Sequence, residues 1–144
     1  MPVLLKATKA VTDRLPKVIS PGAHAVIDYA VAGIFFAGAA LLWKQHRPAA
    51  VSSLVCGLAE TSVAVLTDYP GGVVKKISFP VHGRIDVGFT LLTAALPEFM
   101  KFEDARESRF FDVLSIAMAA SAGLTDFTGS GETGQLSRIH EGAA

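Results

Sequence analysis

The stretch KVISPGAHAVID at residues 17–28 decides how this chain is built, because a close copy, KKISFPVHGRID, follows at residues 75–86. His82 lies 58 positions after His24, and the two copies align without a gap. The same offset relates further polar positions: Asp28 with Asp86, Asp68 with Asp126, and LTDY at 66–69 with LTDF at 124–127. Chance similarity between apolar helices would repeat Ala and Leu rather than His, Asp and Thr in fixed register. We therefore predict a tandem duplication.

Each copy contains two apolar segments, and each segment is long enough for a helix that crosses a hydrocarbon layer, which needs about 20 residues. The four segments occupy residues 23–43, 48–67, 81–100 and 109–126. We predict an all-α integral membrane four-helix bundle made of two duplicated hairpins, one at 19–72 and one at 77–130. A soluble bundle is the alternative, but its helices would have a charged outer face, which these segments lack.

The composition agrees with a single membrane domain. Of the 144 residues, 51% are hydrophobic and only 18% are charged, which is unusually apolar for a soluble domain. Positive and negative residues balance, so no net field would attract nucleic acid, and we expect no nucleic-acid partner. The single cysteine, Cys56, lies in an apolar run, where we expect it to pack in the core.

The two ends of the chain differ from its apolar centre. Residues 1–18 would place apolar and basic side chains on opposite sides of a helix, as in segments that lie on a membrane surface; a disordered basic arm is the alternative. The polar, glycine-rich tail at 131–144 is expected to be flexible. Basic residues are more numerous on the side that carries both termini, so we expect a multi-pass protein with both termini in the cytoplasm.

The duplication predicts a ring of polar side chains near one membrane face. Each copy crosses the membrane twice, so both copies start on the same side and are expected to be related by a twofold axis along the membrane normal. Histidine and aspartate four residues apart share one side of a helix, and two imidazoles with two carboxylates suit zinc, iron, nickel or copper. The predicted metal ligands are His24, Asp28, His82 and Asp86. The other members of the predicted ring are Asp68, Asp126, Tyr29, Tyr69 and Arg84.

Three hypotheses for this ring follow from the sequence. Ionisable groups in membrane segments commonly mark ion or proton pathways, so the first is a small membrane protein that binds a metal ion or relays protons there. The second is a structural or accessory subunit, in a homo-oligomer or a larger membrane complex, in which the ring only locks helices together. The third is electron transfer through haem b held by His24 and His82.

Glu60 is a separate candidate, an acid in the middle of the second apolar segment whose counterpart in the second copy is Met118. It is expected either to accept a proton on an internal path or to hydrogen-bond to Ser53, Thr90 or Thr93.

No phosphate-binding loop and no recognised nucleophile motif is present, so the sequence does not predict an enzyme.

Overall fold

The computed structural model of the chain describes residues 15–102 and 105–128. Its helices are α2 (Pro21–Leu42), α3 (Arg47–Leu66), α4 (Phe79–Phe99) and α5 (Ala105–Leu124). No strand occurs in these two ranges, so the prediction of an all-α fold is confirmed. Each helix coincides, within a few residues at either end, with one of the predicted apolar segments.

Two predictions fall mainly on residues beyond this description. The amphipathic helix expected over 1–18 enters the described part only at residues 15–18, which are not helical. The tail expected at 131–144 lies wholly outside the described residues.

Local sequence explains where the helices begin. Proline at the first position of α2, Pro21, has a fixed φ that suits a helix start. The hydroxyl of Ser20 accepts a hydrogen bond from the backbone N of Ala23 at 3.3 Å, and the imidazole of His46 accepts one from Ala49 at 3.2 Å. These caps satisfy amide groups that the first turn leaves unpaired. His46 therefore has a structural role at the start of α3.

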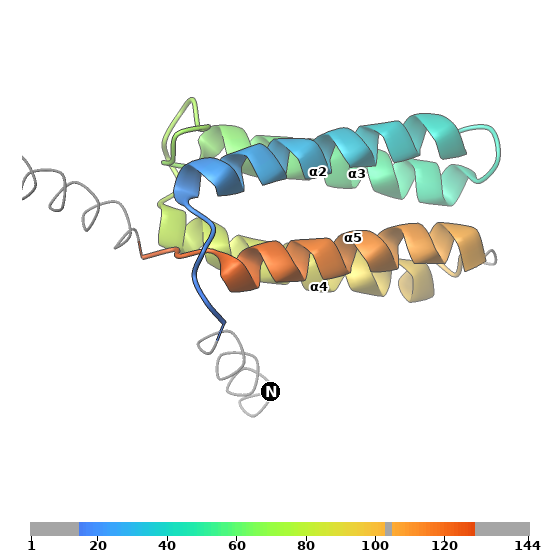
Figure 1. Cartoon of the computed structure of the whole chain (residues 1–144). Helices are drawn as coiled ribbons and strands as arrows, with labels where there is room; N and C mark the ends of the chain where they lie inside the picture. Colours follow the sequence, from blue (N-terminus) through green and yellow to red (C-terminus); the bar gives the residue numbers. More distant parts are fainter. Residues whose placement is uncertain (1–14, 103–104, 129–144) are drawn as a thin grey trace, which may run out of the picture.

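The helices form two hairpins that lie side by side (Figure 1). α2 packs along α3, and α4 packs along α5, whereas contact between the two hairpins is much less extensive. The segment before α2, the loop between α3 and α4 and the segment after α5 all lie at one end of the bundle. The starts of α2 and α4 therefore meet the ends of α3 and α5 at that end.

Backbone contacts at this end occur at positions that repeat in the sequence. The backbone N of Ile19 donates to Leu124 O at 3.1 Å, and that of Ile77 donates to Leu66 O at 2.9 Å. Ile77 lies 58 positions after Ile19, and Leu124 lies 58 positions after Leu66. Each contact joins the start of one hairpin to the end of the other. The repeated positions thus have equivalent places in the fold, while the tandem duplication itself stays a prediction.

The core between the helices is rich in phenylalanine. Phe35 of α2 and Phe111 of α5 are fully buried, and Cys56 of α3 packs in the same cluster, as expected. The hydroxyl of Ser53 donates to the backbone O of Phe35 at 2.6 Å, which ties α3 to α2. Burial of these aromatic rings supplies much of the apolar area that stabilises the bundle.

The outer surface of the bundle carries many large apolar side chains. Exposed examples on the four helices are Ile34, Leu41, Val51, Val55, Leu58, Val87, Leu91, Leu92, Val113 and Ile116. α2 and α3 are long and apolar enough to cross a membrane, although a core helix of a soluble protein can meet the same criterion. α4 and α5 do not meet it, because they carry more charged and polar residues. The described residues thus contain two candidate spans where the sequence predicted four.

Candidate metal centre

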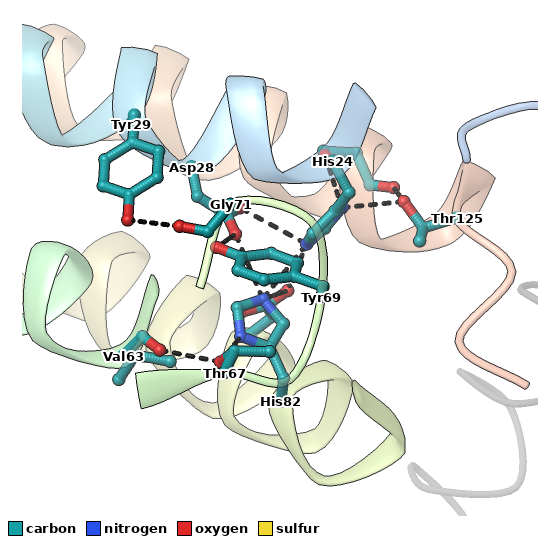
Figure 2. Close-up of polar contacts among 11 residues, drawn as sticks. His24, Asp28, Tyr29, Val63, Thr67, Tyr69, Gly71, His82 and Thr125 are labelled. Atoms are coloured by element: carbon teal, nitrogen blue, oxygen red, sulfur yellow. Dashed lines mark hydrogen bonds and ion pairs between the residues drawn. The ribbon is translucent and has the colours of Figure 1, made fainter. Parts of the chain in front are cut away.

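Four of the predicted site residues meet inside the bundle, near the end where the hairpins are connected. His24 and Asp28 lie one turn apart on α2, and His82 and Asp86 lie one turn apart on α4. Their exposed fractions are 1%, 4%, 1% and 8%, in chain order. One ligand atom from each residue lies within 4.8 Å of the other three, so these residues could hold a metal ion. Figure 2 shows the two imidazoles turned toward each other.

The distances inside this cluster, which we call the His/Asp cluster, are short and nearly equal. The two Nε2 atoms are 3.2 Å apart. Nε2 of His24 lies 2.9 Å from Asp86 and 3.3 Å from Asp28. Nε2 of His82 lies 3.1 Å from Asp86 and 3.3 Å from Asp28. Zinc bonds of about 2.0–2.1 Å place the corners of a tetrahedron about 3.3–3.4 Å apart. These five distances are therefore close to the edges of a tetrahedral shell, with Asp28 offering a different oxygen to each histidine.

Two threonines determine which nitrogen of each imidazole carries a proton. Nδ1 of His24 lies 2.8 Å from Oγ1 of Thr125, and Nδ1 of His82 lies 2.8 Å from Oγ1 of Thr67 (Figure 2). Each threonine hydroxyl already donates its hydrogen to the carbonyl oxygen four residues earlier, at 2.7 Å. The hydroxyl oxygen must therefore accept from Nδ1–H. A neutral imidazole in this tautomer turns the lone pair of Nε2 toward the centre of the cluster.

When both imidazoles are neutral, the centre of the His/Asp cluster is surrounded by hydrogen-bond acceptors. Two imidazole lone pairs and two carboxylates point at one buried place, and their mutual repulsion is poorly screened there. A buried charge is normally paired or bound to a metal. A divalent cation would balance the two carboxylates. Histidines that bind a metal through one nitrogen and donate a hydrogen bond from the other are the usual arrangement in metalloproteins.

Aromatic residues cover the His/Asp cluster. The hydroxyl of Tyr69 donates to Oδ2 of Asp28 at 2.7 Å (Figure 2). Burial raises the pKa of Tyr69 well above its ordinary value, and the hydrogen bond to Asp28 raises it further, so this phenol remains a donor. The ring of Phe79 packs on the imidazole of His82, with the ring centroids 5.9 Å apart. The ring of Phe127 packs on the imidazole of His24, with the ring centroids 5.1 Å apart. These rings separate the cluster from solvent.

Asp68 and Asp126, two other members of the predicted ring, are not part of this cluster. Asp68 is exposed and pairs with Lys75 at 3.3 Å. Oδ1 of Asp126 accepts a hydrogen bond from the backbone N of Thr128 at 2.9 Å. Each aspartate follows a cluster threonine, and consecutive side chains of an extended backbone point to opposite sides. The threonines therefore face the cluster, whereas Asp68 is exposed and Asp126 half-buried outside it, and the wider polar ring stays a prediction.

Tyr29 and Arg84 also lie away from the His/Asp cluster. The hydroxyl of Tyr29 donates to the backbone O of Gly71 at 2.8 Å and stays partly exposed. Arg84 is exposed and lines an apolar groove of about 510 Å³ between α4 and α5. Among the outer ring residues named from the sequence, Tyr69 contacts two of the predicted ligands, Asp28 and His82.

Glu60 is buried and faces the His/Asp cluster. Its exposed fraction is 6%, and it lines a cavity of about 10 Å³ together with three of the four cluster residues. The predicted hydrogen bond to Ser53 is not formed, because that hydroxyl donates to Phe35. The hydroxyls of Thr90 and Thr93 have no hydrogen-bond partner among the described residues, so they do not bind Glu60 either.

The geometry does not fit haem between the two histidines. When two axial imidazoles bind a haem iron, the porphyrin plane lies between them. The Nε2 atoms here are 3.2 Å apart, and Asp28 and Asp86 occupy the space beside them. We therefore do not carry the bis-histidine haem hypothesis forward as a proposal.

Sequence reasoning missed the two threonines that orient the histidines. It took the aspartates of LTDY and LTDF as site residues and passed over the residue before each of them, Thr67 and Thr125. The repetition of threonine at the same offset of 58 was the available signal.

Comparisons with known proteins identify no family: no family model, no curated protein and no solved structure matches this chain. The functional argument therefore depends on the geometry of the His/Asp cluster.

Proposed function

We propose that this protein is a small integral membrane protein that binds one divalent transition-metal ion, with zinc as the best fit, at the His/Asp cluster. The observation that carries the proposal is the convergence of two Nε2 lone pairs and two carboxylates, with contacts between 2.9 and 3.3 Å. Two nitrogen and two oxygen ligands in a tetrahedral arrangement suit zinc. The divalent ion would leave the buried site without net charge, which limits the electrostatic cost of burying it.

The position of the site suggests what the bound ion would do for the fold. Its ligands come from α2 and α4, which belong to different hairpins, and the backbones of the two hairpins approach each other less closely than the helices within each hairpin do. Metal binding to a site that exists only in the folded chain adds its free energy to folding. The ion would therefore hold the two hairpins together.

A lock without metal is the second candidate function. The hydrogen bonds from His24 to Thr125 and from His82 to Thr67 join α2 to the end of α5 and α4 to the end of α3 without any ion. In that state a proton between the two Nε2 atoms would replace the metal, and the cluster could relay protons. The two candidates differ in whether zinc stabilises the protein.

The proposal includes a location in the lipid bilayer. It is supported by the apolar side chains exposed on all four helices and by the length and composition of α2 and α3. We further propose one domain over 19–130 with duplicated hairpins at 19–72 and 77–130, and both termini in the cytoplasm. Its partners would be the bilayer and either further copies of the chain or a larger membrane complex.

The metal proposal is tested by thermal unfolding of the full chain in mild detergent, after chelation, with and without added zinc. Zinc at 100 times its dissociation constant should stabilise the folded state by about 2.7 kcal/mol. The double variant His24→Gln/His82→Gln should lose this increment. His46→Gln is the matched control, because His46 caps α3 outside the cluster, and it should keep the increment. If zinc leaves the wild type unchanged and the double variant merely melts earlier, the lock is the correct function.

The membrane proposal needs a separate experiment. After expression of the full chain and an alkaline carbonate wash of the membranes, the protein should stay in the membrane pellet. Recovery in the soluble fraction as a folded bundle would contradict the proposed location.

A further inference from the structure

The small cavity beside the His/Asp cluster touches only one side of it. His24, Asp28 and Asp86 line the cavity, and His82 does not. In a four-ligand shell, the three lining residues form the triangular face opposite His82. A metal ion with tetrahedral coordination binds a fifth ligand through the triangular face formed by three of its four ligands. The cavity therefore lies where the coordination of a metal in the cluster can expand.

On the side of the cavity that faces away from the cluster, the two copies of the repeat contribute different residues. This side is formed in part by Glu60 and Met118, which are related by the offset of 58. Glu60 is more than nine-tenths buried, and its side chain lines the cavity. A buried polar group without a partner is costly. A donor inside the cavity would remove that cost.

The size and lining of the cavity suit one water molecule. A buried water needs a cavity of roughly 10–15 Å³ and two to four polar partners. This cavity measures about 10 Å³, and its polar lining residues are His24, Asp28, Glu60, Asp86 and Ser121. Its remaining walls are apolar, so they offer no competing partner.

We propose that the metal ion carries a fifth ligand, a water molecule that occupies this cavity and donates a hydrogen bond to Glu60. The inference rests on the proposed metal binding and adds to it a position at which the coordination shell is open. Structural zinc sites are closed by four protein ligands without water, so a water as fifth ligand would set this site apart from them. Glu60 is a positioning residue in this arrangement, because it contacts the water and not the ion.

The absorption spectrum of the cobalt(II) form of the full chain in detergent tests the inference. Four-coordinate cobalt(II) absorbs visible light several-fold more strongly than five-coordinate cobalt(II). The wild type should give the weaker, five-coordinate spectrum. Glu60→Met gives position 60 the residue that its counterpart, Met118, has in the second copy. This variant should give the stronger, four-coordinate spectrum. Glu60→Gln can still accept a hydrogen bond from water and should keep the spectrum of the wild type.

Met118→Leu is the matched control, since it alters the same cavity without touching a polar group, and its spectrum should equal that of the wild type. A four-coordinate spectrum in the wild type, or identical spectra for the wild type and Glu60→Met, would overturn the water position while leaving metal binding intact. A wild type that binds no cobalt would contradict the proposed function itself, and the water position with it.

Discussion

Replacing Thr67 with valine removes the one hydroxyl that accepts a hydrogen bond from Nδ1 of His82, at 2.8 Å, with little change in side-chain shape. The buried N–H is then left unpaired, which costs about 1–3 kcal/mol. The imidazole can also move its proton to Nε2, where it blocks a metal. Loss of such an outer hydrogen bond typically lowers metal affinity about 10–100-fold. Because zinc binding would force the proton back to Nδ1 and leave that N–H unpaired, we expect a loss of zinc affinity of that size.

The assay is competition for zinc between the protein and a chelator of known affinity. Thr125→Val should act in the same direction but less strongly, because Oγ of Ser121 also lies 3.3 Å from Nδ1 of His24. Thr61→Val is the matched control: Thr61 makes the same type of hydrogen bond to the carbonyl oxygen four residues earlier, at 2.8 Å, but holds no histidine. If both cluster variants bound zinc as tightly as Thr61→Val, the tautomer argument would be refuted.

Two further predictions concern the surroundings of the cluster. Alanine at Gly83 would place its Cβ 2.7 Å from the ring of Phe127, so Gly83→Ala should lower the free energy of unfolding by about 1–3 kcal/mol in thermal melts. Gly88→Ala on the same helix meets nothing within 4 Å and should stabilise by about 0.5–1 kcal/mol; equal effects of the two would disprove this packing. Tyr69→Phe removes a buried hydrogen bond to a carboxylate and should cost about 1.5–3 kcal/mol. Tyr29→Phe loses an exposed hydrogen bond and should cost less than about 1 kcal/mol, so a larger loss there than at Tyr69 would contradict the assigned roles.

The sequence was sufficient to predict the four helices and the meeting of the four cluster residues. Prolines before apolar segments indicate helix starts, and the fixed offset of 58 indicates that the two His/Asp pairs have equivalent places. Two copies that begin at the same end of a bundle bring His24 and His82 together by geometry alone.

The outer members of the ring could not be assigned correctly from depth alone. Asp68 and Thr67 lie at nearly the same level of the bundle, and the direction of each side chain depends on how the chain leaves α3. Because Thr67 is already extended, it faces the cluster and Asp68 faces outward, where it pairs with Lys75. The helix-based prediction contained no information on this change of backbone direction.

The surroundings of Glu60 depended on contacts between helices that sequence spacing does not specify. The residue could have hydrogen-bonded to Ser53 on its own helix, but that hydroxyl is used by α2. The rotation of α3 about its own axis decides which neighbouring helix this buried acid faces. The prediction of four spans came from segment length and nearly charge-free interiors, whereas the charged and polar residues of α4 and α5 make these two helices too polar to count as candidate spans.

Elemental analysis of the full chain, purified in mild detergent without chelator, tests the central claim most directly. The account predicts close to one divalent transition-metal ion per chain in the wild type, with zinc favoured, and none above background in His24→Gln/His82→Gln. A wild type without bound metal, even after incubation with zinc and removal of the excess, would contradict the account. A double variant that retains the same metal content would contradict it equally, because the ion would then be bound elsewhere.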